Sequence, residues 1–210
     1  MEKSCITSVA FREPYITHSM IQEKVFVGIN CNFFRDCLPM KGIIYTENIV
    51  GEFQKSLYGF KPHAIQRTID KGYKKIIWLD PAVLPITSID ILINALDQHL
   101  VITITGDATM DKMCNERALK YFGITKEEAK NIKHVGGTIY GFNFNQPKAV
   151  EVFNLWKQAE EDGIFGSQDD FMQGHWSDEA CMALALYKCG VEQYFPIEFK
   201  YLNQKEMPTT

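Results

Sequence analysis

The sequence has no apolar run approaching the roughly 18–20 residues that a membrane-spanning helix needs. Its first residues, MEKSCITSVAFREPY, lack the apolar centre of a signal peptide. The six cysteines include no Cys-x-x-Cys pair, so the spacing of a zinc site is absent. We therefore expect a cytoplasmic protein whose cysteines are free thiols in a reducing compartment.

Basic clusters and several loop motifs are also missing. The net charge is −4 and the lysines and arginines form no stripe, which argues against a nucleic-acid partner. There is no Gly-x-Gly-x-x-Gly, no P-loop motif and no Gly-x-Ser-x-Gly, so the signatures of a dinucleotide site, a P-loop nucleotide site and a hydrolase nucleophile are absent. A small anionic ligand is still compatible with this composition, because a local cationic pocket does not need a basic protein.

The sequence does contain an alternation of strand-type and helix-type segments. Its 210 residues, 46% of them hydrophobic, are enough to bury one large core. The alternation predicts an α/β fold, a single domain with a mostly parallel central sheet flanked by helices. We assign residues 1–205 to this domain and 206–210 to a polar tail, in keeping with a linker to a further domain. Strands are expected at residues 6–11, 42–46, 75–79, 100–105, 137–143 and 194–202, and helices at 15–31, 61–72, 89–96, 149–159 and 177–187.

Several helix ends carry local signals. Pro147 opens the helix over 149–159, and Gly163 ends it. Thr125 begins a Thr-Lys-Glu-Glu segment with the spacing of a capping box. Ser88 and Ser177 are placed to act as N-caps.

Asp80 is the first candidate for a functional residue. It follows the apolar strand over 75–79, and Pro81 ends that strand at once. In α/β sheets, ligands bind beyond the carboxyl ends of the strands, which puts Asp80 at the ligand edge. The alternative is a turn, since Asp-Pro is a common turn signal.

The segment KPHAIQRTIDKGYKKIIWLD, over 61–80, resembles the GT-A class of nucleotide-sugar glycosyltransferases, in which an apolar strand ends in Leu-Asp-x-Asp. The resemblance implies that Asp80 contacts the nucleotide and a divalent metal, Mn²⁺ or Mg²⁺. Ala82 occupies the position of the second aspartate. The metal is therefore expected to be weakly held and bound largely through the donor's diphosphate, whose charge it would neutralise.

Two further segments extend the resemblance. The class has a glycine-containing strand beside the donor sugar, which assigns Gly136 and Gly137 to the pocket because glycine lets the backbone approach a ligand. A bulge or tight turn is the alternative there. His134 is a candidate polar contact.

Asp178 and Glu179 are the candidate catalytic residues. Related transferases carry an acidic pair at the start of a helix here, and in inverting members one carboxylate deprotonates the acceptor hydroxyl. The helix dipole also favours acidic residues in a first turn, and the sequence does not separate the two residues. Trp176 beside them suits a sugar face, although a core tryptophan is the more frequent explanation.

The donor site has further candidates. In this class the end of the first strand holds the nucleotide base and ribose, which assigns Ala10, Phe11 and Arg12 to that contact. Lys61 and Arg67 are candidates for the diphosphate, and a solvated helix face is the alternative for them.

Together these assignments predict a glycosyltransferase of the hexosyltransferase type. It would move a hexose or deoxyhexose from a UDP-sugar to a hydroxyl of a glycan acceptor, with metal assistance. The compact length fits bacterial enzymes and those of large DNA viruses, and the nearest likeness is the N-terminal domain of chlorella-virus glycosyltransferases, which would act in the host cytoplasm. The alternatives are a nucleotidyltransferase of sugar phosphates, whose Gly-rich loop is missing here, and a non-catalytic nucleotide-sugar-binding domain, which Ala82 favours.

Overall fold

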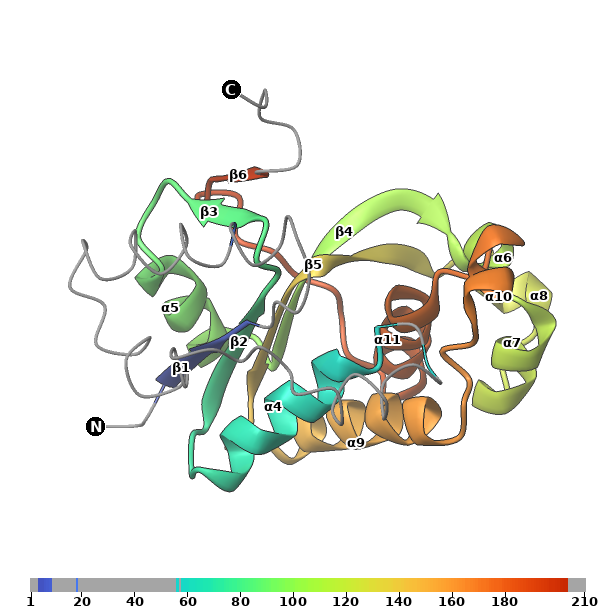
Figure 1. Cartoon of the computed structure of the whole chain (residues 1–210), viewed down its shortest axis with the longest axis horizontal. Helices are drawn as coiled ribbons and strands as arrows, with labels where there is room; N and C mark the ends of the chain where they lie inside the picture. The colour runs from blue at the N-terminus through green and yellow to red at the C-terminus, as the bar shows by residue number, and fades with distance from the viewer. Residues whose placement is uncertain (1–3, 9–17, 19–55, 57, 204–210) are drawn as a thin grey trace.

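The computed structural model describes residues 4–8, 18, 56 and 58–203. Within them, β1 is parallel to β2, whereas β5 is antiparallel to both of its neighbours, β2 and β4. Three of the four strands of the central sheet thus run in one direction (Figure 1). The predicted α/β class, with a central sheet flanked by helices, is confirmed. The sheet has the order β1 (Ser4–Thr7), β2 (Lys75–Leu79), β5 (Lys133–Asn143) and β4 (Val101–Thr109).

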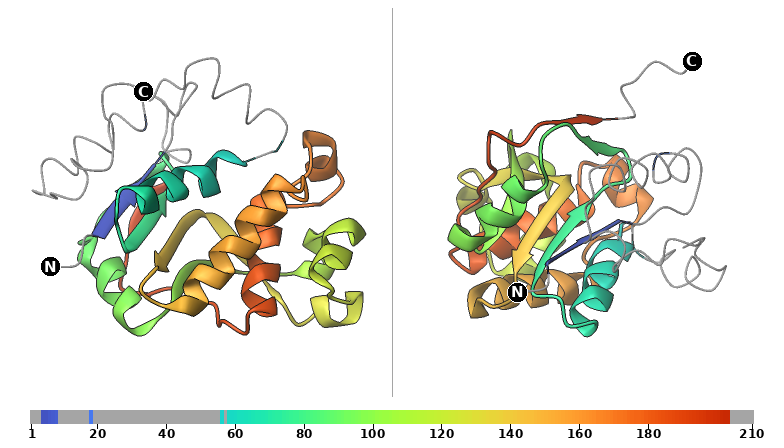
Figure 2. Two further views of the ribbon diagram at one scale, coloured as in Figure 1. Left: turned by 90° about the horizontal axis from the view of Figure 1, so that it is seen from below. Right: turned by 90° about the vertical axis from the view of Figure 1, so that its left-hand side faces the viewer.

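Helices cover both faces of this sheet. The helix α4 lies beside α9 (Figure 2), and both pack with α11 against one face, while α5 packs against the other. A small second sheet pairs β3 with β6 in antiparallel fashion. The longer helices are α4 (Phe60–Asp70), α5 (Asp90–Gln98), α9 (Pro147–Glu161) and α11 (Ser177–Lys188); the shorter elements are α6 (Met110–Met113), α7 (Glu116–Phe122), α8 (Lys126–Ala129), α10 (Gln168–Met172), β3 (Val83–Pro85) and β6 (Tyr201–Asn203).

The strand β2 explains why the sheet is buried on both faces. Successive side chains of a strand point to opposite sides. Ile76 and Trp78 join the aromatic-rich core under α4, α9 and α11, whereas Ile77 and Leu79 join the core under α5. Each of these four side chains is at most 1% exposed.

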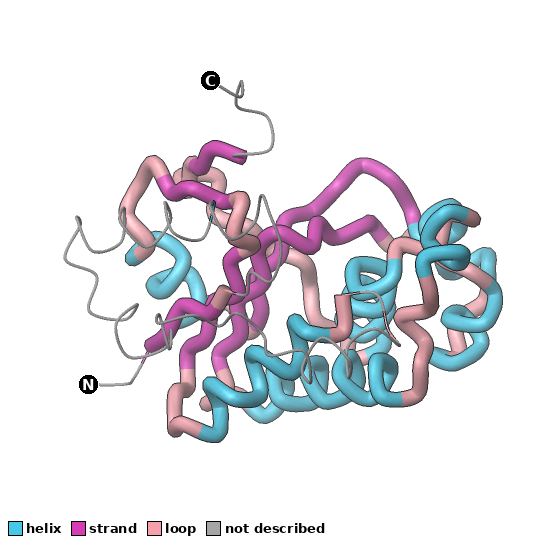
Figure 3. The backbone as a smooth tube through the Cα atoms, viewed as in Figure 1, coloured by secondary structure: helices cyan, strands magenta, loops and turns pink. Residues whose placement is uncertain are grey.

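Past the end of β2, β4 and β5 continue as a long curved two-stranded ribbon, and β4 leads into α6 (Figure 3). Their pairing is irregular: Thr103 pairs with Tyr140, whereas the next residue, Ile104, pairs with Gly136. Residues 137–139 therefore form a bulge in β5. Bulges re-aim side chains and are over-represented near active sites.

Most of the predicted elements within the described residues are confirmed, with three corrections. The strand expected at 194–202 is wrong, because it is reduced to the three residues of β6. Ser177 is not an N-cap, since Trp176 occupies that position and no side chain caps the helix. Ser88 is not the N-cap of α5 either, because Ile89 occupies that position, although the Ser88 hydroxyl accepts a hydrogen bond from the N–H of Asp90. The Thr125 capping box is present. The segments expected at 15–31 and 42–46 and the tail at 206–210 lie outside the described residues, apart from His18.

None of the helices in the described ranges is long and apolar enough to cross a membrane. Cys114, Cys181 and Cys189 are free thiols, as expected.

Candidate functional site

A buried ion pair joins α4 to α11. Lys61 Nζ lies 2.5 Å from Asp178 Oδ2, and the two side chains are 4% and 1% exposed. The Tyr140 hydroxyl donates to the same carboxylate oxygen at 2.9 Å. The indole N–H of Trp156 donates to the backbone carbonyl of Asp178, also at 2.9 Å. These contacts engage one carboxylate oxygen of Asp178, Oδ2, and its backbone carbonyl.

Burial and neighbouring charges set the protonation of this pair. Burial raises the pKa of Asp178 to about 6, with Lys61 opposing the rise and Glu179 adding to it. Burial alone would lower the pKa of Lys61, but the attraction of Asp178 and Glu179 outweighs it and raises that pKa. The raised pKa of Lys61 keeps that residue cationic at neutral pH, whereas a pKa of about 6 leaves Asp178 mostly ionised at pH 7 but brings its protonation close to neutral pH.

Glu179 is held by β5 instead. Its Oε1 accepts a hydrogen bond of 2.7 Å from the N–H of Gly137, and its Oε2 lies 2.7 Å from His134 Nε2. The carbonyl of Gly137 accepts from Lys61 Nζ at 3.0 Å. We refer to Lys61, His134, Gly137, Tyr140, Asp178 and Glu179 as the β5 cluster.

Glycine at position 137 leaves room for two charged side chains. A Cβ there would lie 2.7 Å from both Glu179 Oε1 and Lys61 Nζ, closer than real contacts allow. The absence of a side chain lets two opposite charges approach the same backbone residue. At Gly136, in contrast, a Cβ would meet Ile104 Cβ at 3.4 Å, so this residue faces the apolar side chain of Ile104 and not the β5 cluster.

Asp80 borders the β5 cluster. Its N–H donates to the carbonyl of Thr138 at 2.8 Å, beside Gly137, and its charge contributes to the raised pKa of Lys61. Its Oδ1 also accepts from the N–H of Ala82 at 2.9 Å. The turn considered as an alternative is thus present, and the same residue still lies next to the charged cluster.

Aromatic rings lie beside the cluster. Trp176 is 37% exposed and packs edge-on against the His134 ring, with 5.5 Å between ring centroids. Tyr58 is also 37% exposed, and Lys61 Nζ lies 4.8 Å from the centre of its ring. An ammonium over an aromatic face is a favourable contact.

Backbone strain is concentrated here too. In the described part of the chain, the non-glycine residues with positive φ are Tyr58 at 64° and Ser177 at 40°. One contacts Lys61 and the other precedes Asp178. Such strain persists where the surrounding structure enforces it, and it is frequent at functional sites.

The remaining predicted site residues are not brought to the cluster. Arg67 is exposed six residues after Lys61, about 9 Å further along α4. Ala82 is buried, at 1% exposure. Ala10, Phe11 and Arg12 lie outside the described residues. Sequence reasoning missed Tyr140 and Tyr58, whose polar role carries no local signal because a tyrosine in a strand or turn looks like core.

The donor set for a metal is small. Among the described residues, no group of three or more His, Cys, Asp or Glu side chains could hold a metal ion. Asp178 and Glu179 are engaged by Lys61, Gly137 and His134, which leaves Asp80 as the candidate ligand. The residues present fit a metal only as one carboxylate beside oxygens that a bound diphosphate would supply.

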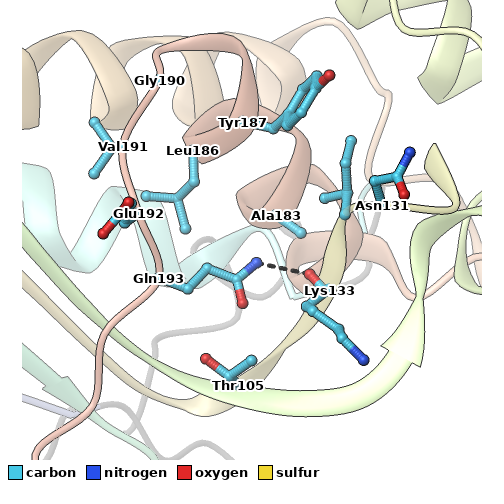
Figure 4. A pocket seen from close by; sticks show the side chains of 11 residues that line it. Thr105, Asn131, Lys133, Ala183, Leu186, Tyr187, Gly190, Val191, Glu192 and Gln193 are labelled. Atoms are coloured by element: carbon cyan, nitrogen blue, oxygen red, sulfur yellow. Dashed lines mark hydrogen bonds between the residues drawn. The ribbon is translucent and has the colours of Figure 1, made fainter. Parts of the chain in front are cut away.

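A separate groove of about 550 Å³ lies along α11 and the start of β5 (Figure 4). The side-chain amide of Gln193 donates to the carbonyl of Lys133 across it. Its lining includes Thr105, Ala183 and Tyr187, and no residue of the β5 cluster.

The fold and site define a mixed α/β protein with a charged cluster where β2 ends beside the bulge of β5. No protein-family model and no curated protein matches the sequence. Among solved structures, the chain is similar to mouse xyloside xylosyltransferase 1 in its apo form, with 14% identity and a TM-score of 0.37. The match covers 83% of this chain and 58% of that one, so this chain spans less than two thirds of its length. A likeness this weak carries no argument about function.

Proposed function

We propose that the chain is a glycosyltransferase that moves a sugar from a UDP-sugar to a hydroxyl of a glycan acceptor. One observation carries the proposal. Asp80 directly follows β2, and its N–H donates to the carbonyl of Thr138, next to Gly137, whose N–H and C=O bond to Glu179 and Lys61. Asp80, which is expected to contact the nucleotide, and Glu179, the candidate base, therefore lie near each other at one edge of the sheet. Ligands bind at such an edge in α/β folds.

Glu179 is the better candidate for the base. A base must come within hydrogen-bond reach of the acceptor hydroxyl. Asp178 is 1% exposed and bound by Lys61 and Tyr140, whereas the Glu179 side chain is 19% exposed. His134, bonded to Glu179 Oε2, is placed to pass the proton onward. Asp178 then acts as a positioning residue that holds Lys61.

Asp80 would be the protein ligand of a divalent metal. When bound, that metal would neutralise the diphosphate as it leaves. The hexose or deoxyhexose donor and the preference for manganese belong to this proposal, as do the acceptor and a viral or bacterial source.

UDP release from a panel of UDP-sugars, with and without Mn²⁺, tests the proposal. We expect Glu179→Gln to lower kcat by about 10²–10⁴-fold, the usual contribution of a general base. Asp80→Asn should weaken the dependence on Mn²⁺. Asp169→Asn, at an exposed carboxylate of α10, is the matched control and should retain full activity. Normal turnover and metal dependence in both Glu179→Gln and Asp80→Asn would refute the assignment.

A non-catalytic nucleotide-sugar-binding domain is the second candidate. The buried Ala82, in place of a second carboxylate, favours it. Calorimetric binding of UDP without turnover of any donor would support this reading over the enzyme.

A further inference from the structure

We infer that Trp176 is the stacking surface of a pyranose subsite for the acceptor sugar, with His134 and Glu179 as its polar edge. The inference rests on the proposed function and adds a binding residue and a ligand class to it.

Trp176 is partly exposed, whereas the other two tryptophans are buried. The sequence has three tryptophans, and Trp78 and Trp156 are 0% exposed while Trp176 is 37% exposed. Trp176 thus presents an apolar ring beside the charged residues of the β5 cluster, an arrangement that tryptophan favours where one side of a contact is apolar and the other is polar.

The backbone holds Trp176 firmly in this position. Its N–H donates to the carbonyl of Met113 at 3.0 Å. Its own carbonyl accepts from the N–H groups of Glu179 and Ala180, at 3.0 and 3.1 Å. The residue that follows, Ser177, has the strained φ of 40°. A rigid aromatic residue loses little conformational entropy when a ligand binds.

Two rings support the indole. His134 packs edge-on against it, and Phe171 of α10 lies at 5.5 Å with the planes tilted by 52°. Met172, the next residue, is 74% exposed and extends the apolar surface. Supported rings of this kind form anchors in binding sites.

The chemistry of this surface matches a pyranose. A pyranose ring has an apolar face of C–H groups and a rim of hydroxyls. The indole suits the C–H face, and the Glu179 carboxylate with the His134 ring suits the hydroxyls. The pair lies 2.7 Å apart, so one sugar hydroxyl reaching Glu179 also comes close to His134.

Intrinsic fluorescence gives a direct test, because Trp176 is the tryptophan that a ligand can reach. The full chain is titrated with the methyl β-glycosides of glucose, galactose and xylose. Sorbitol, which has hydroxyls but no ring face, is the control. We expect a saturable change in emission with at least one glycoside and none with sorbitol. No response to any glycoside, or the same response to sorbitol, overturns the inference.

Variants separate this inference from the proposed function. Saturation-transfer NMR with the responding glycoside should lose its signal in Trp176→Ala and keep it in Trp176→Phe. Tyr187→Ala, at a 43% exposed aromatic residue in the separate groove, should behave as wild type. In the transfer assay, Trp176→Ala should raise KM for the acceptor by roughly tenfold.

The two claims fail in different ways. Sugar binding at Trp176 without transfer would refute the transferase and leave the subsite standing. Transfer that is unaffected by Trp176→Ala would refute the subsite alone.

Discussion

Lys61 and Asp178 carry charges that are expensive to bury. Taking either ion out of water is unfavourable by several kcal/mol, and their mutual attraction offsets that cost only while both are present. Tyr140 adds a hydrogen bond to the same oxygen. The pair therefore makes a small net contribution when intact and a large penalty when broken.

Asp178→Asn should be strongly destabilising, because it leaves the Lys61 ammonium buried without its counter-ion. We expect a loss of about 3–5 kcal/mol in the free energy of unfolding. That corresponds to a fall in Tm of roughly 6–20 °C for a chain of this size. Thermal unfolding followed by circular dichroism measures it.

A second variant keeps this test specific to the ion pair. Lys61→Met combined with Asp178→Asn removes both charges and should recover part of the stability. Asp169→Asn, on the surface, should change stability by less than about 0.5 kcal/mol. An Asp178→Asn protein as stable as wild type would show that the pair is not charged in the folded state.

At the scale of the elements, the bulge in β5 is what assembles the site. The strand offers Gly137 to α4 and α11 together, since Lys61 comes from one helix and Glu179 from the other. A regular strand pairs every residue with β4, and residues 137–139 depart from that pattern.

Gly137→Ala should disrupt the β5 cluster, because its Cβ would lie 2.7 Å from both Glu179 Oε1 and Lys61 Nζ. We expect a loss of about 1–3 kcal/mol, the usual effect of overpacking. Gly136→Ala is the matched control on the same strand, since its Cβ would meet Ile104 Cβ at 3.4 Å. Chemical denaturation of the two variants compares them. A larger loss for Gly136→Ala than for Gly137→Ala would contradict this account of the bulge.

The elements with a clear local pattern were predictable from the sequence. The strand β2 has its predicted bounds because five consecutive residues are apolar or have an apolar stem, and α9 begins at Pro147 as expected. The segment at 194–202 has a strand-like composition, yet most of it is not paired with a neighbouring strand. Strand formation depends on a partner as well as on composition.

The site was predictable only in part. Asp178 and Glu179 were both identified, but only the fold separates a buried ion-paired residue from a partly exposed one. Lys61 was assigned to a diphosphate, and its structural partner lies 117 residues away in sequence. Local spacing and periodicity do not predict a contact between residues so far apart in sequence. They do not predict the bulge either, because it depends on the register of β5 with β4.

At the scale of the whole molecule, the β5 cluster lies where three elements of the larger core meet. α4, β5 and α11 pack into one hydrophobic cluster that also includes Trp156 and Phe153. A change in charge at the cluster should therefore be felt in the cooperative unfolding of the chain, and not only locally.

Stability should fall on the alkaline side. The pKa of Lys61 is raised, and burial raises that of Tyr140 well above its ordinary value. Both groups hold their proton more tightly when folded. Their contribution is complete below the unfolded pKa values of about 10 and is lost as the pH rises through the higher folded values.

Thermal unfolding measured at increasing alkaline pH checks this expectation. Wild type should lose Tm as the pH passes about 10, and Tyr140→Phe should lose less, since it has no hydroxyl to ionise. Absorbance of the tyrosinate ion should show Tyr140 titrating together with unfolding. A Tm that is independent of pH across this range would contradict the assignment.

The way Gly137 holds two charges also bears on how such a site can evolve. Its contacts to Glu179 and Lys61 use main-chain groups, which every amino acid except proline possesses, and they need only the absence of a Cβ. Substitutions elsewhere cannot delete these groups. Trp176 and Phe171, in contrast, contribute side chains that single mutations can replace. Selection for a new sugar could therefore replace the aromatic residues while the backbone contacts of Gly137 to Glu179 and Lys61 stay the same.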